Sequence, residues 1–207
     1  MAKSLFGVTE WITRFAYINL LWIGFSILGL IVFGFFPATI AMFAVIRKWI
    51  RGEDDLPTFR TFWSVYKQEF LKGNLFGVII FIILFIFYID IQFMQLNAEN
   101  WLNLIHIPIY LVMLFFTLMA LYLVPVYVHY DISIFQVFKN AFLIMLINPI
   151  INVMVLISLA VTYYVMTFVP GLLFFFGGSI GAFLIMLGCH QAFQKIEQKK
   201  QKASEAN

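Results

Sequence analysis

Charged residues and cysteine are scarce in this sequence. Asp, Glu, Lys and Arg together make up 11% of the 207 residues, whereas hydrophobic residues make up 63% and the mean hydropathy is +0.97. This composition excludes an ordinary soluble domain and indicates an integral membrane protein in contact with the lipid bilayer. The single cysteine, Cys189, excludes an intramolecular disulfide and is expected to be a buried spectator. The net charge of +3 is too small to indicate a nucleic-acid partner.

Motifs of catalytic and metal sites are also missing from the sequence. It contains no Walker-type phosphate loop, no HExxH motif and no paired CxxC motif. The histidines His106, His129 and His190 do not have the spacing of metal ligands. We therefore expect no cofactor and no metal site, and we expect that the chain is not an enzyme.

Long apolar runs are abundant instead, and they predict membrane-spanning helices. The run LFGVIIFIILFIFYI at 75–89 lacks the alternating polarity of a β-barrel strand. Each crossing of the bilayer requires about 20 apolar residues. The fold class is therefore predicted to be all-α, a polytopic transmembrane helical bundle. Four spans are expected, at 74–93, 105–127, 147–167 and 170–193.

Positive residues gather in a few places along the chain. Six of the thirteen Lys and Arg residues lie between Arg47 and Gly73, and the others include Lys139 and the tail that begins at Lys195. Because cytoplasmic loops collect Lys and Arg, these segments are expected on the cytoplasmic side of a multi-pass protein. The C-terminus is then cytoplasmic, and the connector around Glu99, which has no cation, lies on the opposite side.

The region between Arg14 and Arg47 allows two interpretations. Its 32 residues, 15–46, would measure about 48 Å as one helix, too long for one upright span and short for two. Pro37 favours a hairpin of 12–35 and 37–49, which gives six membrane segments and a cytoplasmic N-terminus. The alternative is one kinked helix, which gives five segments and an N-terminus on the opposite side.

An amphipathic helix is predicted near 57–72. Its aromatic residues recur at helical spacing on one face, while its cations occupy the others. We expect this helix to lie along the inner leaflet and contact lipid, although the aromatic face can also pack on the ends of other helices. A similar spacing near 132–146 predicts a second such helix, either as a repeated unit or by chance. The residues of the first helix are Phe59, Phe62, Trp63, Tyr66 and Phe70 on the aromatic face, with Arg60, Lys67 and Lys72 elsewhere.

Polar and small residues inside the spans suggest two further sites. Asn148 and Asn152 share a helix face next to Pro149, and with Asn19 they form a candidate intramembrane polar site. These asparagines could contact a substrate, but interhelical hydrogen bonding is the more usual role. Gly177 and Gly181 form a small-xxx-small pair, which favours close helix packing or a homo-oligomer interface.

Three stretches resemble the YesL-type family of Gram-positive bacterial membrane proteins, a domain of unknown function. They are NLLWIGFSILGL (19–30), PATIAMFAVIRKWIRGED (37–54) and FRTFWSVYKQEFLKGN (59–74). The resemblance implies a protein of the bacterial cytoplasmic membrane, often encoded beside carbohydrate ABC transporters, and supplies no catalytic residues.

Together these features favour one membrane domain, 1–194, followed by a charged cytoplasmic tail, 195–207. The expected function is that of a non-catalytic accessory component of carbohydrate uptake or utilisation, with ABC permease subunits as the partners. The alternative is a small-solute transporter or channel that uses helices broken at its prolines, Pro37, Pro125, Pro149 and Pro170.

Overall fold

The computed structural model describes residues 2–96 and 103–205 of the chain. Every regular element in this part is an α-helix, which confirms the all-α fold class. Five of the helices, α1, α4, α5, α7 and α8, are long and apolar enough to cross a membrane. The connector that contains Glu99 lies outside the described residues. The helices are α1 (Ala2–Leu28), α2 (Phe35–Ile50), α3 (Thr58–Gln68), α4 (Phe70–Leu96), α5 (Asn103–His129), α6 (Ile134–Ile147), α7 (Pro149–Thr167) and α8 (Pro170–Glu205).

The first hairpin is confirmed, but it turns before the proline. α1 ends at Leu28, the chain reverses over residues 29–34, and Pro37 lies within the first turn of α2. The alternative of one kinked helix is therefore wrong. Proline is compatible with a first helical turn because its missing N–H would have no partner there. α2 has 16 residues, or about 24 Å of helix, so it is shorter than a full upright crossing.

The turn itself depends on an unusual backbone. Leu30 and Ile31 have φ angles of 58° and 64°, in the left-handed region that side-chain-bearing residues rarely adopt. Gly29 and Gly34 approach so closely that a Cβ added to Gly29 would lie 2.3 Å from the Gly34 Cα atom. Only glycine allows this contact, so the two glycines fix the place of the turn.

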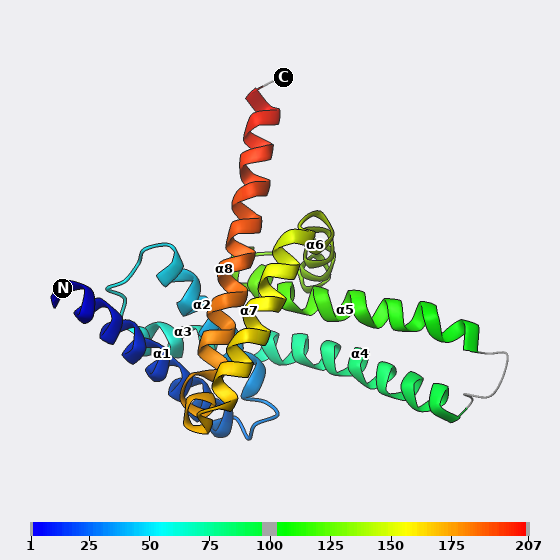
Figure 1. Ribbon diagram of the computed structural model, residues 1–207, viewed down its shortest axis with the longest axis horizontal. Coiled ribbons are helices and arrows are strands. Elements are labelled where there is room, and N and C mark those ends of the chain that lie inside the picture. The colour runs from blue at the N-terminus through cyan, green and yellow to red at the C-terminus, as the bar shows by residue number, and fades with distance from the viewer. Residues whose placement is uncertain (1, 97–102, 206–207) are drawn as a thin grey trace.

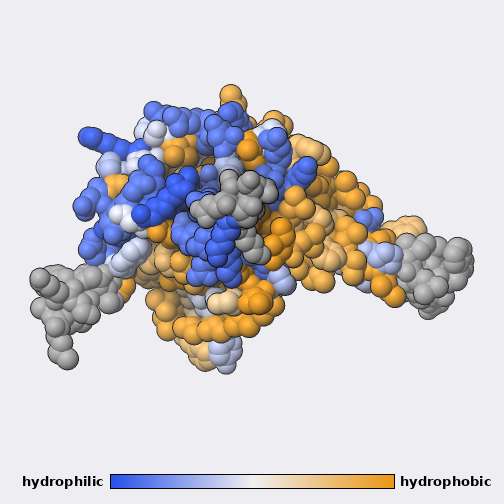
Figure 2. Space-filling view, turned by 90° about the horizontal axis from the view of Figure 1, so that it is seen from above, coloured by the Kyte–Doolittle hydropathy of each residue, from blue (hydrophilic) through white to orange (hydrophobic). Residues whose placement is uncertain are grey.

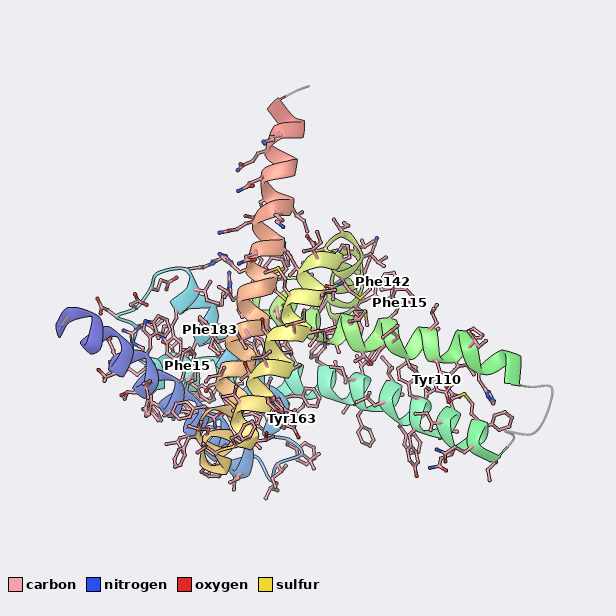
Figure 3. The ribbon with its side chains drawn as sticks, viewed as in Figure 1. Phe15, Tyr110, Phe115, Phe142, Tyr163 and Phe183 are labelled. Carbon is pink, nitrogen blue, oxygen red and sulfur yellow. The ribbon has the colours of Figure 1, made fainter. Side chains whose placement is uncertain are left out.

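Two helical hairpins run in different directions from the middle of the molecule (Figure 1). α7 and α8 run side by side, and α4 and α5 extend away from them in another direction. α1 crosses α8, where the rings of Phe15 and Phe183 meet at 5.1 Å between centroids (Figure 3). On the other arm, Phe115 of α5 and Phe142 of α6 lie next to each other (Figure 3).

The core consists of two clusters of buried residues that α2 and α5 connect. The first surrounds α2, whose Ala38, Ala41, Val45 and Ile46 are fully buried by α1, α3 and α8. The second lies among α4 to α8 and contains Leu123 of α5. α2 is thus surrounded by protein, whereas α4 and α5 expose most of their apolar side chains, as lipid-facing helices do.

The close approach of α4 to α2 depends on Gly77. A Cβ at this position would lie 2.2 Å from the Phe36 ring, so Gly77→Ala should force that ring to move. We expect a loss of about 1–2 kcal/mol in the free energy of unfolding, because the half-buried ring can partly yield. Thermal unfolding in detergent would measure the change. Gly24→Ala is the matched control, because nothing lies within 4 Å of its added Cβ; equal losses in the two variants would contradict the packing.

α8 continues as one helix into the charged C-terminal region. It runs without interruption from Pro170 to Glu205, and its last turns project beyond the other helices (Figure 1). The charged region beginning at residue 195 is therefore helical up to Glu205.

Candidate functional site

Polar side chains from several connections meet on one face of the molecule. Arg14 Nη1 of α1 lies 3.1 Å from Asp54 Oδ1 in the α2–α3 connection. The Tyr127 hydroxyl of α5 donates a hydrogen bond to Glu69 Oε2 at 2.5 Å, between α3 and α4. Figure 2 shows hydrophilic residues gathered on this part of the surface, while apolar residues cover the α4–α5 arm. We call this surface the polar face; it includes Arg14, Asp54, Glu69 and Tyr127.

An open pocket of about 390 Å³ lies on this face between α2, the end of α3 and the end of α5. We call it the α2–α5 pocket. Its polar wall has eight residues and its apolar wall has four. The apolar residues are Ile40, Ala44, Val65 and Val128, and the polar ones are Arg47, Lys48, Gln68, Glu69, Tyr127, His129, Tyr130 and Asp131.

Helix ends put these polar side chains into place. Arg47 and Lys48 occupy the last turn of α2, where cations interact favourably with the helix dipole. Glu69 lies at the single-residue break between α3 and α4. On the other side, α5 ends at His129, and Asp131 follows in the connection to α6. The pocket therefore forms where three helices end. The last carbonyl groups of each helix have no hydrogen-bond partner within that helix.

Arg47 is held in a fixed position at the pocket. Its Nη1 donates a hydrogen bond to the Val128 carbonyl oxygen at 2.7 Å and so links α2 to α5. Its Nε is buried without a hydrogen-bond partner. The His129 side chain is 6% exposed, and its Nδ1 is also buried without a partner. Such unpaired buried groups are uncommon and often mark a site that a ligand or water completes.

The charges of the pocket are not paired with one another. Among the described residues, ion pairs join Arg14 to Glu10 and Asp54, and His129 Nε2 lies 3.8 Å from Glu197 Oε1. None of these contacts joins Arg47 or Lys48 to Glu69 or Asp131. Burial and the nearby Glu197 carboxylate raise the pKa of Tyr130, so its hydroxyl remains a hydrogen-bond donor at neutral pH.

The three asparagines expected at an intramembrane site lie in two separate places. Asn19 accepts a hydrogen bond from the Ser179 backbone N–H at 3.0 Å and donates one to the Phe174 carbonyl at 2.8 Å. Asn19 therefore joins α1 to α8. Asn148 lies between α6 and α7 and donates to the Ile144 carbonyl of α6 at 2.9 Å.

Asn152 belongs to a buried network that includes one unexpected residue. Its Nδ2 donates to the Met145 carbonyl at 2.9 Å, and its Oδ1 accepts from the Tyr122 hydroxyl at 2.5 Å. The network joins α5, α6 and α7, and all three residues are buried. Sequence reasoning missed Tyr122 because a tyrosine within a long apolar run gives no sign of its hydrogen-bond partner.

The amphipathic helix is shorter than expected, and its aromatic face is divided between two environments. Phe62 and Tyr66 are buried, with ring centroids 5.2 and 5.0 Å from that of Phe25. Phe59 and Trp63 are 48% and 39% exposed. Their contact with lipid stays a prediction.

The cations of this region lie on the exposed surface. Lys67 Nζ lies 5.0 Å from the Trp63 ring centroid, which suits a cation–π contact. Arg60 and Lys72 are exposed. α3 ends at Gln68, so Phe70 and Lys72 belong to the first turn of α4.

The glycines of α8 that approach other helices are not the expected pair. A Cβ at Gly178 would lie 2.8 Å from Asn19 Oδ1, and one at Gly188 would lie 2.4 Å from a Val155 methyl group. At Gly181 the nearest atom is a Leu159 methyl group at 3.9 Å, and at Gly177 only Leu173 of the same helix is near. Gly178 and Gly188 therefore allow the close packing within this chain, and a homo-oligomer through Gly177 and Gly181 stays a prediction.

Proline mostly begins helices in this structure. Pro149 and Pro170 are the first residues of α7 and α8, and Pro37 lies in the first turn of α2. Pro125 lies inside α5, which continues past it to His129. The prolines therefore leave the helices of the described part unbroken, which removes one argument for a transport pathway.

The His, Cys, Asp and Glu side chains of the described part do not gather into groups of three that could hold a metal ion, and the single cysteine is buried. Cys189 is 1% exposed, and its Sγ lies 3.8 Å from the Leu121 carbonyl oxygen. This environment is apolar, which disfavours the reactive thiolate.

Comparison with known proteins supports the resemblance seen in the sequence. Residues 15–91 match the family described as "Protein of unknown function, DUF624". The chain is 47% identical over 124 residues to "Uncharacterized protein YteU" and 35% identical over 130 residues to "Uncharacterized protein YesL", both of Bacillus subtilis. It is 36% identical over 131 residues to "Uncharacterized protein YesV" of the same organism. Over these residues the chain is similar to the YesL-type proteins.

The matches cover only part of each YesL-type protein. They include 58% of this chain and 54% of YteU, 63% and 61% for YesL, and 63% and 62% for YesV. The chain thus spans less than two thirds of the length of these relatives, and their printed names give no activity. No solved structure matches the chain.

Proposed function

We propose that this protein is a non-catalytic accessory component of a carbohydrate uptake or utilisation system. The observation that carries the proposal is the use of the intramembrane polar groups. Asn19 and the Asn152–Tyr122 pair bind neighbouring helices, so these polar groups are engaged in holding the bundle together, the usual role of asparagine between membrane helices. The link to carbohydrate systems comes from the family resemblance.

The polar face is the proposed docking surface for permease subunits, and we place it in the cytoplasm. Arg51, Arg60, Lys67 and Lys72 are all exposed and belong to the segment rich in positive residues. The positive-inside rule then predicts a C-terminus on the cytoplasmic side of the bacterial membrane. We infer the same side for the N-terminus, because Arg14 of α1 contacts Asp54 after α2; α2 then serves as a sixth membrane segment. Exposed Arg and Lys side chains favour a partner with an acidic cytoplasmic surface.

Copurification from bacterial membranes tests the proposal. We expect an ABC permease subunit to copurify with the full chain, and less of it when Arg60 and Lys67 are both replaced by Gln. Both side chains are exposed, so their loss should leave the fold unchanged. The control is a second double variant, Ser158→Ala with Thr162→Ala. Both residues lie within the candidate membrane span α7 and carry no charge. Equal recovery of permease from the two double variants would contradict docking on the polar face.

A flux assay separates this proposal from the transporter alternative. The purified chain in liposomes should give no sugar flux above that of protein-free liposomes. Saturable flux of a sugar or another small solute would instead establish a transporter, and the accessory role would be withdrawn.

A further inference from the structure

The α2–α5 pocket holds cations and carboxylates that do not neutralise one another. Arg47 and Lys48 line it from α2, whereas Glu69 and Asp131 line it from the α3–α4 break and the α5–α6 connection. The ion pairs of the described residues, within 4.0 Å, include none between these two sets. Separated charges of opposite sign around one cavity suit a ligand that carries both a negative and a positive group.

Each set retains free hydrogen-bonding capacity. Arg47 uses one Nη1 hydrogen for the Val128 carbonyl, and Lys48 has three ammonium donors and no hydrogen bond from them. Glu69 accepts the Tyr127 hydroxyl on Oε2, which leaves Oε1 open. Asp131 is exposed and lies on the same pocket. The cations can therefore bind an oxyanion while the carboxylates bind an ammonium group.

The size and position of the pocket restrict the ligand further. Its volume of about 390 Å³ is within the range of about 300–1,000 Å³ that small-molecule sites occupy. The pocket lies where three helices end, and one wall consists of Ile40, Ala44, Val65 and Val128. A ligand with a zwitterionic head and an apolar body would satisfy both walls.

We propose that the α2–α5 pocket binds the headgroup of a phosphatidylethanolamine-class lipid. The phosphate lies against Arg47 and Lys48, and the ammonium group lies against Glu69 and Asp131. The glycerol and first methylene groups lie against Ile40 and Val65. Phosphatidylglycerol has no ammonium group, so its glycerol head leaves the two carboxylates unpaired and its net charge is repelled by them. This binding does not depend on the proposed accessory role.

Two single variants distinguish the two halves of the site. Native mass spectrometry of the detergent-purified full chain, titrated with ethanolamine or glycerol phospholipids of equal acyl chains, would measure each dissociation constant. Lys48→Gln should weaken both lipids about five-fold, because each loses one contact to its phosphate. Asp131→Asn should weaken the ethanolamine lipid about five-fold and strengthen the glycerol lipid, because only the first loses a partner.

The control variants remove one lysine and one aspartate charge from residues that do not line the pocket. Lys72→Gln and Asp55→Asn remove exposed charges that do not line the pocket, and they should leave the preference for the ethanolamine lipid unchanged. Opposite effects of Asp131→Asn on the two lipids are not expected from a loss of folding. Equal binding of both lipids to the unmodified chain would overturn the proposal. Soluble phosphoethanolamine that binds as tightly as the lipid would overturn the lipid as the source of the headgroup.

Discussion

Replacing Phe62 by alanine is expected to cost about 3–5 kcal/mol of unfolding free energy. The side chain is 0% exposed, and its ring lies 5.2 Å from that of Phe25 on α1. Removing the ring would leave a cavity between α3, α1 and α2, since these helices cannot close fully around a smaller side chain. Chemical unfolding in detergent micelles, followed by tryptophan fluorescence, would measure the loss.

Phe59 on the same helix supplies the matched control. It is the same residue type, three positions earlier, and it is 48% exposed. Phe59→Ala should therefore change the unfolding free energy by less than about 1 kcal/mol. Similar losses for the two variants would mean that α3 does not pack its Phe62 face on the bundle.

The long helices could be predicted from the sequence because each bilayer crossing needs a run of about 20 apolar residues. The expected span 170–193 begins where α8 begins, and the expected span 147–167 ends where α7 ends. The other two spans, 74–93 and 105–127, each lie within an observed helix, α4 and α5. The apolar runs indicated these helices, and Pro149 and Pro170 lie at the first residues of α7 and α8. Both signals act locally, so they can be read from the sequence.

The turn of the first hairpin could not be predicted in the same way. It depends on Leu30 and Ile31 with positive φ angles, which their side chains disfavour, so no local preference indicates it. The two glycines around them fit only in the folded structure, where Gly29 meets Gly34. Pro37 indicated the presence of a break and misplaced it by a few residues.

The α2–α5 pocket was beyond sequence reasoning because distant residues form it. Arg47 and Val128 are 81 positions apart, and Tyr127 and Glu69 are 58 positions apart. The charged stretch after Arg47 was visible, but the side chains from the end of α5 that complete the pocket come from an otherwise apolar helix. Only the crossing of α2 and α5 brings the two sets together.

Replacing Asn152 by leucine is expected to cost about 2–3 kcal/mol, because two buried partners lose their hydrogen bonds. Leucine has a similar size but leaves the Tyr122 hydroxyl without an acceptor and the Met145 carbonyl without this donor. Asn148→Leu is the matched control, since Asn148 donates only to the Ile144 carbonyl four residues earlier. Asn148→Leu should lower the unfolding free energy by less than half as much as Asn152→Leu, because the hydrogen bond it removes does not join two packed helices.

A double-mutant cycle with Tyr122→Phe isolates the contact between α5 and α7. If the 2.5 Å bond between Tyr122 and Asn152 joins these helices, the coupling energy should lie between about 0.6 kcal/mol, the average between membrane helices, and about 1.7 kcal/mol, the largest value. A coupling near zero would mean that Asn152 stabilises the fold through Met145 alone. In liposomes, Asn152→Leu should lower stability without creating or removing solute flux, since a group engaged between helices has no place in a pathway. A variant that kept its stability but changed flux would instead make Asn152 part of a solute-binding site.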